Sequence, residues 1–206
     1  MGRARCCCAA WLVVVLVAMS AFVVTFLLVV ELTPVEVTVD EASLGRLSLA
    51  NTSGNGNATA PSFLLSCNLS LAVAVHNPSW STRAWRTSPL DAELRFRGRP
   101  FAAFRMGTAG EWGRIRALRT EVHRVASAAE RAPVDLGRFE VAEFARERVA
   151  GEFWLELVVA GEFKYQAHSG RRRIKVSCPL RLSLLPTSAA FERVECTEEC
   201  RDDDDD

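Results

Sequence analysis

One uninterrupted apolar run, at residues 9–30, constrains this chain more than any other feature of its sequence. The run reads AAWLVVVLVAMSAFVVTFLLVV, and its only polar side chains are those of Ser20 and Thr25, whose hydroxyls can each bond back to a helix carbonyl. As an α-helix the run would be about 33 Å long, which is enough to cross a hydrocarbon core of about 30 Å. The run therefore predicts a transmembrane helix.

Charges on either side of the run predict its orientation. Arg3 and Arg5 precede it, whereas acidic residues, among them Glu31, Glu36 and Asp40, follow it before the next basic residue, Arg46. Because basic flanks stay in the cytosol, we expect a cytosolic N-terminus and an extracellular or lumenal C-terminal part. The alternative is a signal peptide cleaved near Ala18-Met19-Ser20, but cleavage there would leave residues 22–30 as a second apolar stretch on the mature N-terminus.

Length and charge limit the rest of the chain. About 170 residues come after the run, which suits one domain with an ordinary core. The whole chain carries 25 Lys and Arg against 25 Asp and Glu, and this balance argues against nucleic acid as a partner. The organisation we expect is a cytosolic N-terminus (1–8), a transmembrane helix (9–30), a membrane-proximal strand with a glycosylated loop (31–61), the remainder of a β-sandwich that begins near residue 35 (62–186), and a C-terminal segment with a cysteine pair and an acidic tail (187–206).

Three of the seven cysteines stand before the apolar run. Cys6, Cys7 and Cys8 lie at the cytosolic mouth of the predicted helix. Cysteines at this position are either S-palmitoylated or simply reduced thiols, and the sequence leaves both readings open.

The other four cysteines lie on the outer side, where an oxidising compartment permits two disulfides with three alternative pairings. They are Cys67, Cys178, Cys196 and Cys200. Cys67 and Cys178 either bridge two sheets or stay buried as small apolar side chains. The short spacing of Cys196 and Cys200 favours a local disulfide.

Three N-glycosylation sequons fall on the side that the charges place outside the cytosol. They are Asn51-Thr52-Ser53, Asn57-Ala58-Thr59 and Asn68-Leu69-Ser70. Each triplet is a weak signal alone, but all three agree with the orientation. Asn51, Asn57 and Asn68 are therefore candidate glycosylation sites.

Alternation of apolar and polar residues predicts several strands after the run. Residues 67–76, 153–159 and 173–184 alternate cleanly, as half-buried strands of antiparallel sheets do. Cys67 and Cys178 fall on the inward phase of their strands. Shorter or weaker strand candidates lie at 35–39, 44–49, 92–96 and 101–106.

Two stretches have helical spacing. Between residues 115 and 129 apolar residues repeat in steps of three and four, but β-branched Val122 and Val125 keep a strand as an alternative. Residues 136–148 predict a short helix that Gly151 ends. Several strands, turns between them and at most one or two short helices predict a mainly β fold, in which an antiparallel β-sandwich follows the transmembrane helix.

The order of these segments is similar to that of a known family. After one N-terminal span and an extended strand come NLSLAVAVHNPS (68–79), GEFWLELVVAGEFKY (151–165) and RRRIKVSCPLRL (171–182). The most specific pieces are the Asn77-Pro78 turn and the strand end Lys175-Val176-Ser177-Cys178. Over about residues 35–185 and the anchor, the chain resembles plant harpin-induced-like and non-race-specific-disease-resistance-like membrane proteins, which carry a late embryogenesis abundant domain of the second subgroup.

This resemblance implies a seven- or eight-stranded sandwich of immunoglobulin-like or fibronectin-like shape on the outer face of the plasma membrane. It also implies a role in responses to pathogens and abiotic stress, and no enzymatic activity. The chain departs from the family at Trp80, Trp85 and residues 101–114, so no partner surface is carried over from there. The acidic end at residues 202–206 stands where some relatives have a hydrophobic tail that is exchanged for a lipid anchor.

The sequence contains no pattern typical of a catalytic, cofactor or metal site. His76, His123 and His168 are isolated, and no serine sits in a nucleophile elbow. Cys196 and Cys200 lack the second nearby pair of a zinc site. We therefore expect neither an enzyme nor a cofactor.

Arg171, Arg172 and Arg173 form a basic triplet between two predicted strands. They are either a solvated hairpin turn or a cationic tip that contacts anionic cell-wall polysaccharide or lipid headgroups.

Together these features predict a glycosylated, non-enzymatic protein of the plant stress or defence response, anchored in the plasma membrane. Its extracellular sandwich would bind membrane or cell-wall partners. The alternative is a lipid- or apolar-ligand-binding module at the membrane surface, with a pocket between its sheets.

Overall fold

The computed structural model describes residues 3–31, 34–51, 63–107, 113–166, 170–184 and 191–199, and in its first helix the side chains of residues 11 and 13–26. The described part is mainly β, with two helices, as the sequence predicts. The elements are α1 (Arg3–Glu31), β1 (Glu36–Asn51), β2 (Phe63–Asn77), β3 (Ala84–Arg86), β4 (Leu90–Phe96), β5 (Arg99–Met106), β6 (Arg114–Ile115), β7 (Arg119–Val134), α2 (Arg138–Ala150), β8 (Glu152–Tyr165), β9 (Arg171–Ser183), β10 (Val194–Glu195) and β11 (Thr197–Glu198).

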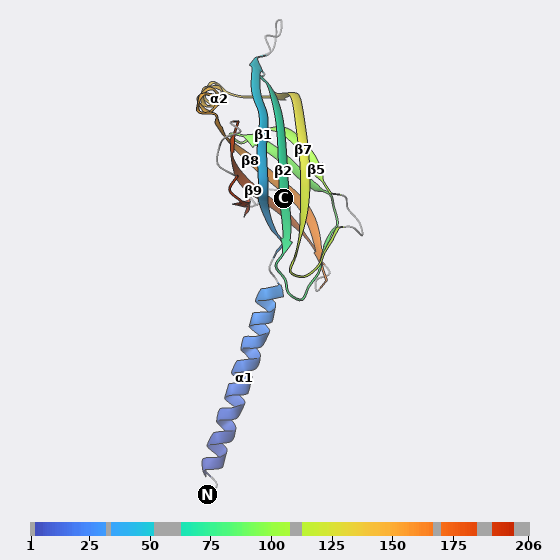
Figure 1. Ribbon diagram of the computed structural model, residues 1–206. Coiled ribbons are helices and arrows are strands. Elements are labelled where there is room, and N and C mark those ends of the chain that lie inside the picture. Colours follow the sequence, from blue (N-terminus) through green and yellow to red (C-terminus); the bar gives the residue numbers. More distant parts are fainter. Residues whose placement is uncertain are drawn as a thin grey trace, which may run out of the picture.

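The strands form two antiparallel sheets that lie face to face (Figure 1). The first sheet has the order β10-β1-β2-β7. In the second, β8 pairs with β9 along one side and with β3 and β4 along the other. The outer strands of this second sheet are β11 on β9, β6 on β3 and β5 on β4. Helix α1 extends from one end of the sandwich, and α2 lies at the opposite end (Figure 1).

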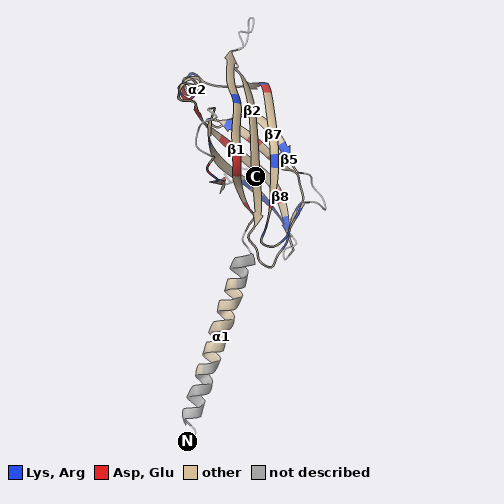
Figure 2. Cartoon of the chain, in the orientation of Figure 1, with Lys and Arg blue, Asp and Glu red and all other residues tan. Residues whose placement is uncertain are grey.

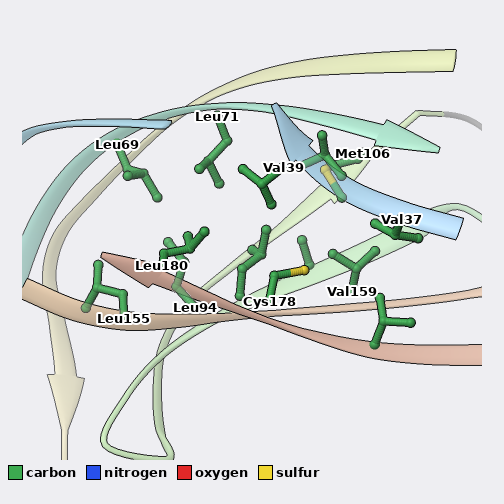
Figure 3. Close-up of a cluster of buried hydrophobic side chains, with 14 of the residues drawn as sticks. Val37, Val39, Leu69, Leu71, Leu94, Met106, Leu155, Val159, Cys178 and Leu180 are labelled. Carbon is green, nitrogen blue, oxygen red and sulfur yellow. The ribbon is translucent and has the colours of Figure 1, made fainter. Parts of the chain in front are cut away.

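Apolar side chains from both sheets fill the space between them (Figure 3). The strands at 67–76, 153–159 and 173–184 have the phases that the sequence predicts, because in each the alternate apolar residues are buried. Burying one such Val or Leu contributes roughly 1.5–3 kcal/mol. The drawn core includes Val37, Val39, Leu69 and Leu71 of the first sheet and Leu94, Leu155, Val159 and Leu180 of the second.

The two short strands predicted at 35–39 and 44–49 are one continuous strand, β1. Its pairing with β2 shifts register between Val39 and Glu41 and again between Leu44 and Arg46. Each shift inserts one residue, so the inward-facing positions change from odd to even numbers and back. This change of phase made one strand look like two.

The ambiguous stretch at 115–129 is a strand and not a helix. β7 pairs with β2 along its whole length, from Arg119 opposite Asn77 to Val134 opposite Phe63. Its side chains alternate between half-buried and exposed positions. Because even its inward face is only half-buried, the apolar alternation is weak, and the helical spacing is a coincidence of composition.

The helix predicted at 136–148 is confirmed as α2, and Gly151 ends it in a left-handed conformation (φ 74°). Phe144 packs between Phe96 and Phe153 at ring-centroid distances of 5.6 and 5.3 Å. These aromatic contacts attach α2 to the second sheet.

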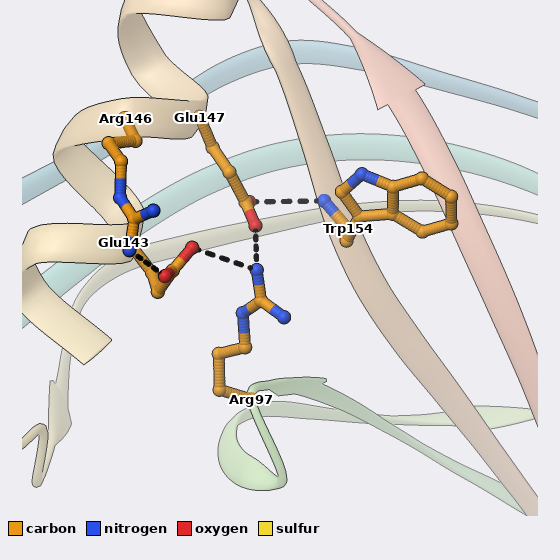
Figure 4. Close-up of polar contacts among 5 residues, drawn as sticks. All are labelled: Arg97, Glu143, Arg146, Glu147 and Trp154. Atoms are coloured by element: carbon orange, nitrogen blue, oxygen red, sulfur yellow. Dashed lines mark hydrogen bonds and ion pairs between the residues drawn. The ribbon is translucent and has the colours of Figure 1, made fainter. Parts of the chain in front are cut away.

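A buried carboxylate completes the attachment of α2 (Figure 4). Glu147, whose side chain is only 8% exposed, accepts hydrogen bonds from the guanidinium of Arg97 at 2.6 Å and from the backbone N–H of Trp154 at 3.1 Å. Glu143 also pairs with Arg97, at 3.2 Å, and with Arg146. The helix is thereby joined to the β4–β5 turn and to the start of β8.

Among the described residues, no helix has both the length and the apolar character that crossing a membrane requires. The predicted transmembrane helix is therefore not confirmed, and it stays a prediction.

Candidate functional site: the end of the sandwich next to α1

The chain enters the sandwich at Val35, four residues after the end of α1. The Val35 backbone N–H donates a 3.0 Å hydrogen bond to the phenol oxygen of Tyr165, at the end of β8. Both residues are buried. Burial raises the pKa of the Tyr165 hydroxyl, and the hydrogen bond from Val35 partly opposes that rise. The end of β8 is thus held beside the junction with α1, and we call this end of the sandwich the tether end.

A network of buried hydrogen bonds around Asn77, Ser79 and Thr82, which we call the Asn77 knot, shapes the loop after β2, also at the tether end. The Asn77 amide, fully buried, donates to the carbonyl oxygen of Thr82 at 2.9 Å and to those of Ile115 and Arg116 at 3.4 Å. Its oxygen accepts the backbone N–H of Ser79 at 3.2 Å. The hydroxyls of Ser79 and Thr82 bond each other at 2.5 Å. One side chain therefore fixes two segments that lie almost forty residues apart.

The knot presents two exposed apolar side chains. Trp80 is 55% exposed, at the tip of the loop that Asn77 and Ser79 hold. Leu118 is 61% exposed in the turn before β7, and its backbone N–H donates to the Ser79 carbonyl at 3.0 Å. Leu118 has a positive φ of 53°, a conformation that leucine rarely adopts. The fold thus exposes two large apolar side chains on turns that the Leu118–Ser79 hydrogen bond joins.

Sequence reasoning missed this arrangement. It interpreted Asn77-Pro78 as a turn, and as part of a family resemblance, but assigned no contacts to the asparagine. The available signal was the turn chemistry of Asn-Pro-Ser after a strand, because asparagine and serine side chains bond to nearby backbone groups. The more distant carbonyls, on residues 115 and 116, could not be inferred from spacing.

Exposed arginines lie in the same loops as the two apolar side chains and in a neighbouring segment. The Gln166 N–H donates to the Arg83 carbonyl at 3.0 Å, which ties the β8–β9 connection to the Trp80 loop. Figure 2 shows Lys and Arg at this end of the strands as well as along β1, β7 and β5. The exposed arginines here include Arg83 and Arg116 from the two turns, Arg119 from the first position of β7, and Arg171, Arg172 and Arg173 from the start of β9.

Two of these arginines have acidic partners. Arg171 lies 3.6 Å from Glu162, and Arg172 lies 3.4 Å from Glu198. In the described part of the chain, the other four arginines make no ion pair. The predicted basic triplet is therefore exposed and belongs to a larger basic surface that includes residues from two other loops.

Farther inside, an ionisable cluster lies between the sheets beneath these loops. Arg86, only 3% exposed, is 3.2 Å from the Nε2 atom of His123 and 3.7 Å from Glu121. The pKa of His123 is lowered. Burial is the main cause and Arg86 adds to it, whereas Glu121 opposes the shift. Gly107 lies so close to Arg86 that an added Cβ would meet its guanidinium at 2.8 Å. The packing around Arg86 identifies this cluster as part of the interior rather than an open site.

The segment 194–199, which we call the strap, joins the open edges of the two sheets. It pairs with β1 through β10 and with β9 through β11. Between these pairings the Cys196 N–H donates to the Val37 carbonyl at 3.0 Å, and its sulfur forms a disulfide with Cys178. Glu199 pairs with Lys175 at 2.7 Å and with Arg95 at 3.2 Å, and the hydrogen bond to Lys175 is the main reason that its pKa is lowered.

This disulfide corrects both pairings proposed from the sequence, Cys67 with Cys178 and Cys196 with Cys200. Cys67 and Cys178 do both face inward, but the strap brings Cys196 to the inward face of β9. Cys67 remains a free, buried thiol, and burial raises its pKa to about 11. Cys200 lies outside the described residues.

The remaining predicted sites are scattered over the molecule. Asn51 ends β1, 15 residues along the strand from its start beside the tether end, and it is exposed. Asn68 is exposed on the outer face of β2, and Asn57 lies outside the described residues. The backbone at Cys6, Cys7 and Cys8 is helical in α1, but their side chains lie outside the described part. The described residues bring together no group of three or more metal-ligating side chains.

Comparison with known proteins adds little to this picture. No family model matches the chain, and no curated protein matches it. A solved structure of a protein from Archaeoglobus fulgidus aligns with 69% of this chain and 100% of its own, at 8% identity and a TM-score of 0.29. A likeness this distant supports no conclusion about fold or function.

Proposed function

We propose that this chain is a membrane-anchored, non-enzymatic protein of the plant stress or defence response. It presents its sandwich on the outer side of the plasma membrane to partners in the membrane or the cell wall. One observation carries the proposal: an apolar run of 22 residues lies within a 29-residue helix that leads directly into a disulfide-bonded sandwich. The described apolar side chains of α1 are exposed, with Trp11 at 74% and Phe22 at 66%, and a surface of this kind needs a lipid or protein environment.

Two further observations support an outer location. A disulfide is typical of secreted and cell-surface domains, because cytosolic thiols are kept reduced. Asn51 and Asn68 are exposed, so glycans at these positions would not enter the core. Neither site lies in the loops of the tether end.

The arrangement of the long strands supports an immunoglobulin-like or fibronectin-like sandwich. Strands β1, β2 and β7 form one layer, and β9, β8, β4 and β5 form the other. A three-on-four antiparallel arrangement of this kind is shared by many cell-surface domains of unrelated function. The assignment to plant stress or defence therefore rests on the family resemblance alone.

The test uses the full chain, tagged at both ends, in plant microsomes. We expect the protein to stay in the membrane pellet after alkaline carbonate, and added protease to remove only the N-terminal tag. Glycosidase should lower its apparent mass, and the triple variant N51Q/N57Q/N68Q should abolish that shift. Extraction by carbonate, or loss of about 20 N-terminal residues as expected of signal cleavage, would contradict the proposal.

The alternative, a lipid- or apolar-ligand-binding module, needs a cavity between the sheets. Two hollows among the described residues lie on the outer face of the first sheet, and one has a mixed lining that includes Arg46, Ser66, Asn68 and Glu130. Mass spectrometry of the purified chain discriminates the two functions, because a binding module should retain stoichiometric lipid after delipidation.

A further inference from the structure

The tether end cannot lie far from the end of α1, whatever angle the helix takes. Three residues lie between Glu31 and Val35, and the four residue-to-residue steps span at most about 14 Å. The Val35–Tyr165 hydrogen bond fixes the end of β8 to this junction. The Gln166–Arg83 and Leu118–Ser79 hydrogen bonds connect the two exposed loops to it in turn. If α1 spans a bilayer, these loops lie beside its headgroup layer, which adds about 5–8 Å on each side of the hydrocarbon core.

The exposed side chains of the tether end are those that suit an anionic membrane surface. Trp80 and Leu118 are exposed on loops in which Asn77 already satisfies the backbone carbonyls of Thr82, Ile115 and Arg116. Tryptophan is enriched at the membrane interface because one side of its ring system is apolar and its N–H is polar. Leu118 is exposed and has a positive φ, which is a strained backbone conformation for leucine. Strain of this kind is concentrated at functional positions, so it points to a function for this surface.

The charge of this end is complementary to phosphate headgroups. Arg83 follows Trp80 by three residues, and Arg116 and Arg119 lie on either side of Leu118 in the chain. Within the described residues none of the three arginines makes an ion pair. The nearby acidic groups are Glu162 and Glu198, which pair with Arg171 and Arg172, Glu121, which faces Arg86 and His123, and Glu36, at the start of β1.

We propose that the tether end is a membrane-docking surface: Trp80 and Leu118 enter the headgroup region of the bilayer that holds α1, and Arg83, Arg116 and Arg119 bind its anionic phosphates. The inference rests on the proposed anchoring, because α1 keeps the surface at high local concentration near the membrane. Docking would hold the long axis of the sandwich upright and direct α2 and Asn51 away from the bilayer. Cell-wall polysaccharide is a poorer fit, since the tether keeps these loops at the membrane.

The experiment measures backbone hydrogen exchange of the full chain in lipid nanodiscs. One disc contains phosphatidylcholine alone, and the other contains phosphatidylcholine with about one third phosphatidylglycerol, an anionic lipid. We expect exchange in residues 77–83 and 116–119 to be at least about threefold slower in the anionic disc. High salt should reverse much of this protection, because it screens the arginines.

Three variants make the test specific. R83Q/R116Q/R119Q and W80S/L118S should each lose the protection, whereas R99Q/R138Q/R148Q, which removes three exposed arginines from the α2 end, should keep it. Equal exchange in the two discs, equal loss in the α2-end variant, or protection by added polygalacturonate in place of anionic lipid would overturn the docking surface. A chain that fails to remain in either disc would instead contradict the anchoring, so the two failures are distinguishable.

Discussion

The phenol oxygen of Tyr165 accepts a hydrogen bond from the backbone N–H of Val35, 130 residues earlier in the chain. Y165F removes the acceptor and leaves a buried N–H unpaired, so we expect it to cost about 1 kcal/mol of unfolding free energy. Urea unfolding of the chain in detergent micelles measures this loss. An unchanged midpoint would mean that water replaces the phenol.

The same tyrosine predicts a pH dependence. Tyr165 is the only tyrosine of the chain, so ultraviolet absorbance reports its ionisation directly. Burial raises its pKa in the folded state, so its contribution to stability is present below the ordinary tyrosine pKa and is lost as the pH rises through the raised value. We expect this alkaline loss in the wild type and not in Y165F. A titration at the ordinary value in the folded chain would contradict the buried position.

The strap should depend on its disulfide. Cys178 and Cys196 are 18 residues apart, and closing a loop of that size contributes about 3 kcal/mol by restricting the unfolded chain. C178S/C196S should therefore lower the unfolding free energy by about that amount, and it should speed hydrogen exchange in residues 194–199. The matched control is E195Q, an exposed substitution within the strap. If exchange in the strap stays slow in the double variant, its strand pairing alone is sufficient to hold it.

Cys67 should be unreactive until the sandwich unfolds. It is a free, buried thiol with a pKa of about 11, so at pH 8 only roughly one molecule in a thousand carries the reactive thiolate. With Cys6, Cys7, Cys8 and Cys200 changed to serine, labelling by a thiol reagent should follow the unfolding rate and be immediate in denaturant. Rapid labelling in native buffer would show that the core near β2 opens locally.

The strands that the sequence predicted well are those with one buried face. Strands β2, β8 and β9 each have one buried face, so their alternation is regular and their phases could be read directly. β7 has no fully buried face over most of its length, so its pattern was compatible with a helix. In β1 the two inserted residues broke the alternation, and no local rule separates such a bulge from a strand end.

The disulfide and the tether end were not predicted, because both depend on contacts between segments that are distant in the sequence. The Cys178–Cys196 disulfide exists because the strap crosses from β1 to β9, and the spacing of the cysteines contains no information about that path. The tether end likewise collects three loops, and only its Arg171–Arg173 component was evident as a basic triplet. Trp80 and Leu118 become neighbours of these arginines only after the sheets form.

The carboxylate of Glu147 should contribute more to the unfolding free energy than the neighbouring side chains of α2 do. E147A leaves the Trp154 N–H without its acceptor and removes a close partner of Arg97, so we expect a loss of about 2 kcal/mol. R146Q, which alters an exposed arginine one residue away, should change stability by less than about 0.5 kcal/mol. Thermal unfolding of both variants gives the comparison, and equal effects would contradict the attachment shown in Figure 4.

The Asn77 knot offers the sharpest test of how the tether end is built. In N77D a carboxylate faces the carbonyl oxygens of Thr82, Ile115 and Arg116 with no hydrogen to donate, so repulsion is added to the lost bonds. We expect N77D to cost about 3 kcal/mol or more, and N77A, which only removes the bonds, to cost about 2 kcal/mol.

The two variants should also differ from a neighbour on the same strand. Asn68 lies on the exposed face of β2, so N68D in the unglycosylated chain should change stability by no more than about 0.5 kcal/mol. Hydrogen exchange should accelerate in residues 78–83 and 116–119 together in N77A, because one side chain joins both segments. If only the first segment loosens, the bonds from Asn77 to the carbonyls of residues 115 and 116 do not hold the second turn.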